Sequence, residues 1–205
     1  MPKPFTEQER RTIRDRLMDE GLKRFARQGV RAMRIDDLCR DVGIAKGSFY
    51  SFFASKEALF FALSDRQDEM HKSEMLAQMR EATGEPDAVL GAFFDMVMER
   101  IDNDPLIGII EDSGDFAYLM RHAPPGYVAG NSKRDHDFVV DMASLFQARF
   151  PQIRADADMI EGTMTLMLAL RMQRDYLSSI EVYAPTTALL RDMFTKRSIE
   201  GPWHD

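Results

Sequence analysis

Residues 46–51, Lys-Gly-Ser-Phe-Tyr-Ser, combine side chains that are suited to reading nucleic acid. A lysine hydrogen-bonds the acceptors of guanine or neutralises a phosphate, a serine contacts several base edges, and a tyrosine hydroxyl reaches a phosphate. A glycine lets the backbone approach its ligand closely. We therefore predict contacts with double-stranded DNA at Lys46, Gly47, Ser48, Tyr50 and Ser51.

Two short amphipathic helices must position this segment. The first is predicted from about residue 35 to 41 and the second from about 45 to 52. Phe49 and Phe53 lie four residues apart and align with Leu38 and Val42, so we interpret these four as core residues. Gly43 lies between the helices and suits a turn with positive φ. Two helices joined in this way form a helix-turn-helix, whose second helix enters the major groove.

Two more cations flank the motif. Arg34 comes just before its first helix, and Lys56 starts a long helix predicted from about residue 55 to 81, with Ser55 as its cap. Cations and the free amides of a helix start both attract phosphate, so we add Arg34 and Lys56 to the predicted DNA contacts. The alternative for each basic residue is a solvated surface charge. A first helix, from about residue 6 to 27, begins with the capping-box spacing of Thr6 and Glu9 and stops before Gly29.

The charge of the chain is divided unequally. Residues 1–56 carry 13 Lys and Arg against 8 Asp and Glu, whereas residues 57–205 carry 14 against 26. The first part is therefore at +5 and the rest at −12, within a net charge of −7. This asymmetry is typical of a protein that meets phosphates at one end only.

Residues 13–63 resemble the TetR family of bacterial transcriptional regulators. The resemblance is carried by Gly29, residues 37–38, 42–44 and 46–50, Phe53, and residues 55–59. It implies an all-α homodimer whose last two helices form a four-helix bundle. It also implies a ligand pocket in the body and repression that is relieved when a small molecule binds.

Two positions depart from the family pattern. Met33 and Arg34 replace the usual threonine or serine before the second helix, and Ala45 replaces the usual hydroxyl cap of the third. Losing such a cap typically costs about 1 kcal/mol, which packing by the two phenylalanines of that helix can offset. Arg34 can contact phosphate by its charge instead. Neither departure changes the predicted fold.

The rest of the chain also has helical periodicity, and we find no β-rich alternation. We predict about nine helices, all-α: a three-helix DNA-binding head at residues 1–54 and a ligand-binding and dimerisation domain at 55–205. Residues 159–170 are apolar on almost every side, so that helix must be covered all round, either as a central core helix or by a partner subunit. Residues 188–194 carry a second apolar stripe, which would join the first in an interface between two subunits.

Candidate ligand-binding residues come from the methionine- and phenylalanine-rich body. Residues 85–205 hold 9 of the 15 methionines, and methionine adapts to varied apolar ligands. The alternative is an ordinary core at helical spacing. The predicted apolar wall and its polar partners are Phe93, Met96, Phe116, Met120, Met142 and Met167, with Glu111, Asp115, His136 and Arg171.

The sequence favours a ligand-responsive repressor that binds a palindromic operator as a homodimer and is released by a small-molecule effector. We expect no catalytic residues, metal or cofactor, because phosphate loops, nucleophile elbows and paired metal-spaced histidines are missing from the sequence. A protein-binding helical adaptor is the alternative, and an enzyme using the C-terminal pocket is a third. The single cysteine, Cys39, fits a reducing compartment, and no signal peptide or membrane span is predicted. We expect a cytoplasmic bacterial protein.

Overall fold

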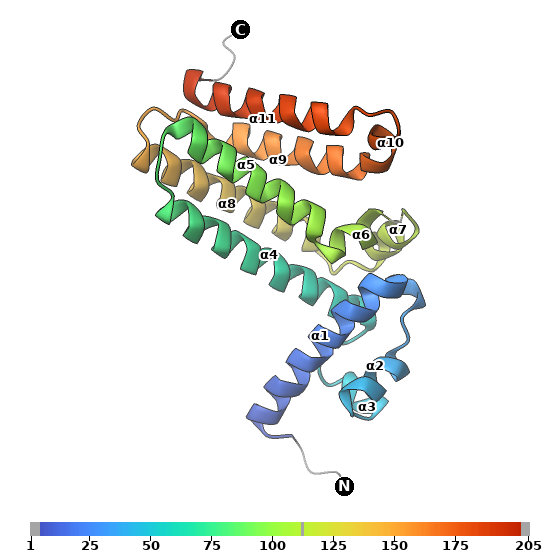
Figure 1. Ribbon diagram of the computed structural model, residues 1–205. Coiled ribbons are helices and arrows are strands. Elements are labelled where there is room, and N and C mark those ends of the chain that lie inside the picture. Colours follow the sequence, from blue (N-terminus) through green and yellow to red (C-terminus); the bar gives the residue numbers. More distant parts are fainter. Residues whose placement is uncertain (1–4, 112, 202–205) are drawn as a thin grey trace. The chain divides into compact units, whose positions relative to one another are not determined.

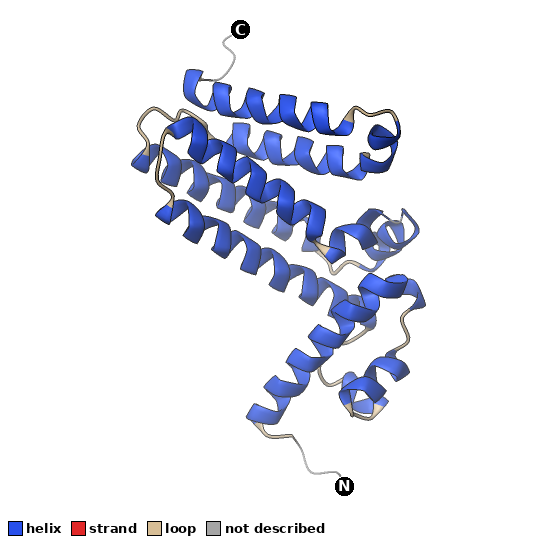
Figure 2. Ribbon diagram, in the orientation of Figure 1, coloured by secondary structure: helices blue, strands red, loops and turns tan. Residues whose placement is uncertain are grey.

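The computed structural model describes residues 5–111 and 113–201. Its regular structure within these ranges is entirely helical, which confirms the all-α class (Figure 2). Eleven helices lie in this part of the chain: α1 (Glu7–Ala32), α2 (Ile35–Val42), α3 (Lys46–Phe49), α4 (Lys56–Glu81), α5 (Pro86–Asn103), α6 (Pro105–Glu111), α7 (Ser113–His122), α8 (Tyr127–Arg149), α9 (Ala157–Met172), α10 (Arg174–Ser179) and α11 (Tyr183–Glu200).

Two breaks account for the difference from the nine helices predicted. The sequence predicts one helix from residue 105 to about 120 with an interruption near residues 113–114, and the structure describes α6 and α7 on either side of residue 112, which lies outside the described residues. The stretch from 155 to 180 divides into α9 and α10 at Gln173, whose amide donates to the Leu170 carbonyl three residues back at 3.1 Å. Such a bond tightens the last turn of α9 and ends its regular ladder.

The described chain forms two compact units. The first combines residues up to 68 with residues 104–125, and the second combines 69–103 with the residues from 126 onward. Helix α4 therefore supplies its first half to one unit and its second half to the other. Among the described residues, every helix is too short or too polar to span a bilayer.

The first unit is organised around α1, which contacts α2, α6 and α7. Helix α1 starts with the predicted capping box: the Thr6 hydroxyl accepts from the Glu9 amide at 3.2 Å, and the Glu9 carboxylate accepts from the Thr6 amide at 2.7 Å. Gly29, where the sequence predicted a stop, has a non-helical backbone with φ 75° and ψ 169°, and a short further turn runs on from this kink to Ala32. The unit's core includes the fully buried Leu17, Phe25 and Leu59.

The second unit is a bundle in which α5 and α9 each pack against α11, and α8 packs against α9 (Figure 1). One hydrophobic core runs through it and includes Phe93, Phe94, Phe146 and Phe194. The Phe93 ring meets the Phe146 ring edge-on, with centroids 5.3 Å apart. Met75 and Met79, from the second half of α4, belong to the same core.

Candidate nucleic-acid interface

Gly43 makes the turn between α2 and α3. Its φ of 78° and ψ of 35° are left-handed, a conformation that other residues adopt only at a steric cost. The amides of Gly43 and Ile44 both donate to the Cys39 carbonyl at 2.9 Å, so they satisfy the free end of α2. These bonds confirm the predicted glycine turn of the helix-turn-helix.

The buried face of the motif is the predicted one. Phe49 and Phe53 are buried, with ring centroids 6.0 Å apart, and Leu38 and Val42 of α2 are buried as well. Helix α3 has only four residues and a non-helical N-cap at Ala45, which makes no side-chain capping bond. Packing therefore carries most of the stability of α3, because a helix this short is unstable alone.

The opposite side of α3 and the turn after it present the predicted DNA contacts. Lys46, Gly47 and Ser51 are exposed, Ser48 is half-buried, and Tyr50 is 51% exposed. The Ser51 hydroxyl donates to the Ser48 carbonyl at 2.7 Å. Outward placement leaves these groups accessible to a groove, although their contacts with DNA remain a prediction.

Lys46 forms an ion pair with α2. Its Nζ lies 3.0 Å from Oδ2 of Asp36, and both side chains are about half exposed. The hydrogen bond and the charge of Asp36 raise the pKa of the Lys46 ammonium, so the side chain stays cationic. Lysine has three donors, and two remain for a base or a phosphate.

Lys56 supports the link between α1 and α2. Its Nζ donates to the carbonyls of Arg31, at 2.7 Å, and Met33, at 3.1 Å. These carbonyls lie at the end of α1, where the helix leaves its acceptors without partners of its own. Arg34 is exposed at the N-cap position of α2 and makes no side-chain capping bond. The phosphate contacts predicted for both residues remain predictions.

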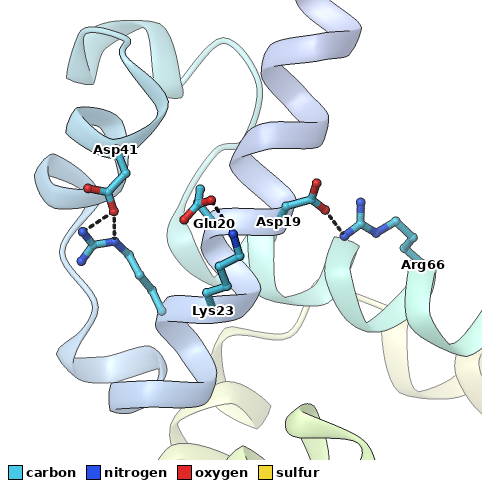
Figure 3. A network of polar contacts seen from close by, with 6 residues as sticks. Asp19, Glu20, Lys23, Asp41 and Arg66 are labelled. Atoms are coloured by element: carbon cyan, nitrogen blue, oxygen red, sulfur yellow. Dashed lines mark hydrogen bonds and ion pairs between the residues drawn. The ribbon is translucent and has the colours of Figure 1, made fainter.

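Ion pairs tie α1 to its neighbours in the first unit (Figure 3). The half-buried Arg24 donates its Nε to Oδ2 of Asp41 at 2.8 Å and so fastens the end of α2. Asp19 of α1 pairs with Arg66 of α4 at 3.0 Å. Lys23 and Glu20, which both lie on α1, form a local ion pair. The motif is therefore attached to a helix that is also fixed to α4.

Helix α7 makes two further polar contacts within the first unit. Asp115 is buried, and its Oδ2 accepts the amide of Val30 at 2.8 Å, directly after the kink at Gly29. The Tyr118 hydroxyl donates to the buried carboxylate of Glu57 in the first turn of α4. Burial opposes ionisation of Glu57, but hydrogen bonds from Tyr118 and Ser55 outweigh it and lower the pKa of the carboxyl.

Stability should fall in alkali because of Tyr118. Burial, and then its bond to Glu57, raise the pKa of the tyrosine to about 12 from 10.0. A raised pKa gives stability that is complete below pH 10 and is lost as pH rises through 12. Urea denaturation at pH 9 and pH 11.5 should show this loss, and Tyr118→Phe should reduce it. An unchanged pH dependence in the variant would contradict the assignment.

The predicted ligand residues fall into two sets. Glu111, Asp115, Phe116 and Met120 belong to the first unit, where Asp115 is buried while Phe116 and Met120 are 43% and 40% exposed. The other six belong to the second unit: Phe93, Met142 and Met167 lie in its core, Met96 packs against that core, His136 pairs with Glu161, and Arg171 pairs with Asp102. The ten predicted residues are therefore divided between the two units.

Sequence reasoning missed the residues that hold the motif from outside. Arg24 and Asp41 are 17 positions apart, and Asp115 and Val30 are 85 apart, so helical periodicity gives no signal for either contact. Arg10 and Arg14 of α1, which touch residues 51–53, were missed for the same reason.

Gly47 provides a test that separates folding from binding. A Cβ built at this glycine meets nothing within 4 Å, and alanine is the better helix former. We expect Gly47→Ala to leave the Tm unchanged or slightly higher, yet to weaken DNA binding roughly tenfold, because the methyl group lies where a groove must approach. Thermal denaturation and a DNA titration check this. Unchanged DNA affinity would remove Gly47 from the interface.

Comparison with known proteins finds similarity to bacterial transcriptional regulators. Residues 17–63 match the family described as bacterial regulatory proteins, tetR family. Over 73 residues the chain is 30% identical to YerO of Bacillus subtilis (strain 168), described as an uncharacterized HTH-type transcriptional regulator. That match covers 36% of this chain and spans only 25% of the length of YerO.

Solved structures show the same fold. A TetR-family transcriptional regulator (ECA1819) from Pectobacterium atrosepticum has a TM-score of 0.64 and 16% identity, covering 97% of this chain and 100% of the other. RolR in complex with the ligand resorcinol has a TM-score of 0.57 and 18% identity, covering 98% of this chain and 99% of the other. At such identities the likeness establishes the all-α fold alone.

Proposed function

We propose that this chain, a member of the TetR family of bacterial regulatory proteins, is a cytoplasmic repressor that binds a palindromic operator as a homodimer. A small-molecule effector releases it. The observation that carries this proposal is the helix-turn-helix with buried Phe49 and Phe53 and an exposed polar side around Lys46 and Tyr50. Within this proposal, residues 1–54 read DNA and residues 55–205 bind the ligand and the partner subunit.

The residues on this polar side of the motif divide by chemistry. Lys46, Ser48 and Ser51 suit base edges, Tyr50 suits a phosphate or a thymine methyl, and Gly47 leaves room for close approach. Arg34 and Lys56 supply positive charge beside the motif and orient the head on the phosphate backbone. Lys56 makes such a contact with the donor that remains beyond its bonds to Arg31 and Met33.

Two substitutions test the DNA-reading role. Lys46→Ala and Tyr50→Ala should each weaken operator binding roughly tenfold, because each deletes one groove contact worth about 1–2 kcal/mol, and should leave the fold intact. Lys133→Ala is the matched control: Lys133 is another exposed lysine paired with an aspartate, at 2.5 Å from Asp137. Equal affinities for all three variants would favour a helical adaptor over a DNA-binding regulator.

Apolar side chains on α9 and α11 support the homodimer. Leu166 and Leu168 on α9 are 54% and 38% exposed, and Leu189 and Met193 on α11 are 61% and 45% exposed. The two helices pack together, and we assign their exposed apolar residues to the subunit interface expected from the sequence. A second copy related by a two-fold axis would cover them and place two heads on one duplex, in register with mirrored half-sites.

The effector-binding role is supported by the family and by RolR, a structural neighbour that was solved with resorcinol bound. Within the second unit, the pocket residues we propose remain Phe93, Met96, His136, Met142, Met167 and Arg171. Helix α4 links the DNA-binding segment to the body through one continuous element of 26 residues. An effector that binds better when α4 is tilted would separate the two heads and mismatch them to the operator.

The switch is tested by titrating the operator complex with candidate effectors. An effector that binds the DNA-free protein more tightly than the DNA-bound protein should weaken operator affinity. The factor equals the ratio of the effector's affinities for these two forms. A tightly bound effector that leaves operator affinity unchanged would rule out the switch, while DNA binding itself would stand.

A further inference from the structure

We infer that Arg10 and Arg14 of α1 are positioning residues, which hold the C-terminal end of the DNA-reading segment in its binding conformation. The inference rests on the proposed function, because it concerns how the same segment is presented to DNA. Neither arginine belongs to the motif, and both act on residues 51–53 across about 40 positions of sequence.

Each arginine makes two contacts with this end of the segment. The Arg10 guanidinium donates to the Ser51 carbonyl at 3.0 Å, and its Cζ lies 5.0 Å from the centre of the Phe52 ring. The Arg14 guanidinium donates to the Phe52 carbonyl at 3.5 Å, and its Cζ lies 4.6 Å from the centre of the Phe53 ring. A planar guanidinium can stack on a ring and donate to a nearby carbonyl at the same time.

The segment needs this external support. Helix α3 has four residues and no side-chain cap at Ala45, so few internal bonds fix its geometry. The carbonyls of Ser51 and Phe52 follow its last turn, where helical partners run out and where the helix dipole favours a cation. Arginines fixed on the long helix α1 supply both the donors and the positive charge.

Helix α1 itself is well placed to act as the support. Its predicted capping box fixes the start of the helix beside Arg10, and Asp19 pairs with Arg66 of α4 further along. Phe53, on which Arg14 stacks, is a buried core residue, so its ring is a fixed platform. The exposed Tyr50 directly precedes residues 51–53, which the arginines hold, and the exposed Ser51 is the first of these residues.

A positioning role differs from a phosphate contact in what it changes. A lost phosphate contact weakens binding to every sequence about equally and reduces the salt slope by about one per charge. When positioning is lost, the base-reading side chains are no longer held in one conformation. Operator binding is therefore weakened more than binding to unrelated DNA. A side chain that keeps the positive charge but not the planar group is then insufficient to restore operator affinity.

The experiment compares three variants of the full-length chain. One double variant, Arg10→Ala with Arg14→Ala, removes the contacts. A second double variant, Arg10→Lys with Arg14→Lys, keeps the charges but loses the planar guanidinium groups. Arg11→Ala is the matched control, because Arg11 lies on the same helix, is 74% exposed, and pairs only weakly with Glu7 at 3.8 Å. Hydrogen exchange of residues 46–53 is measured without DNA, together with affinities for a selected operator and for an unrelated duplex over a range of salt.

Both double variants should exchange faster over residues 46–53 than the wild type. Both should lose roughly tenfold in operator affinity, and the lysine pair should keep the wild-type salt slope and affinity for unrelated DNA. Arg11→Ala should lose only a small part of its operator affinity, equal to the long-range electrostatic contribution of one charge. Unchanged exchange in the alanine pair, or full recovery of operator affinity in the lysine pair, would overturn the inference. Wild-type protein that binds no duplex would instead refute the proposed function, and the exchange data would still test the arginines.

Discussion

Phe93→Ala should lower the free energy of unfolding by about 3–5 kcal/mol, which is the usual cost of emptying the space of a buried phenylalanine. Phe93 is 2% exposed, and its ring packs against Phe146 at 5.3 Å and Phe194 at 6.1 Å. The substitution therefore removes contacts with rings from two other helices, α8 and α11. Urea denaturation with a two-state fit measures the change.

The matched control is Phe116→Ala, the same chemical change at a side chain that is 43% exposed. We expect it to change stability by less than about 1 kcal/mol, because little buried surface is lost. A loss below 1 kcal/mol for Phe93→Ala as well would contradict its place in the core.

Asp115→Ala should destabilise the first unit by about 1–3 kcal/mol. The buried carboxylate accepts the Val30 amide at 2.8 Å, and its removal leaves a buried donor without an acceptor. Asp115 also fills the space beside Gly29, since a Cβ at that glycine would come within 2.2 Å of Oδ2 of Asp115. Gly29 and Asp115 are therefore matched to each other, and the kink of α1 depends on both.

Asp115→Asn is the control for this prediction. An amide keeps the size of the side chain and offers an oxygen to Val30, so it should retain more stability than alanine. Urea denaturation monitored by hydrogen exchange at residues 29–34 localises the effect. Equal losses for asparagine and alanine, with no change in exchange at these residues, would contradict the assigned bond.

Local features of the fold were predictable from the sequence. The capping box of Thr6 and Glu9 and the left-handed Gly43 depend on residues within five positions of each other, so spacing and residue type determine them. Ser55 is another case, since its hydroxyl accepts from the Ala58 amide at 3.1 Å as the helix start requires. The four apolar residues of the motif followed from helical periodicity alone.

Other features depend on contacts between distant residues. The break at Gly29 was predicted, but the short turn beyond it was not, and the Val30 amide of that turn donates to the distant carboxylate of Asp115. Lys56 was predicted to face phosphate, and nothing in its spacing indicates that two carbonyls of the preceding segment hold its ammonium. Composition likewise cannot separate a core methionine such as Met142, which is fully buried, from a pocket wall.

The central claim is that paired heads read double-stranded DNA, and selection from random duplexes tests it most directly. Fragments retained by the purified chain should converge on an inverted repeat whose half-sites lie about one helical turn apart, with two protomers bound and affinity falling steeply as salt rises. A monomeric protein that enriches no sequence and ignores every duplex at low ionic strength would contradict the account.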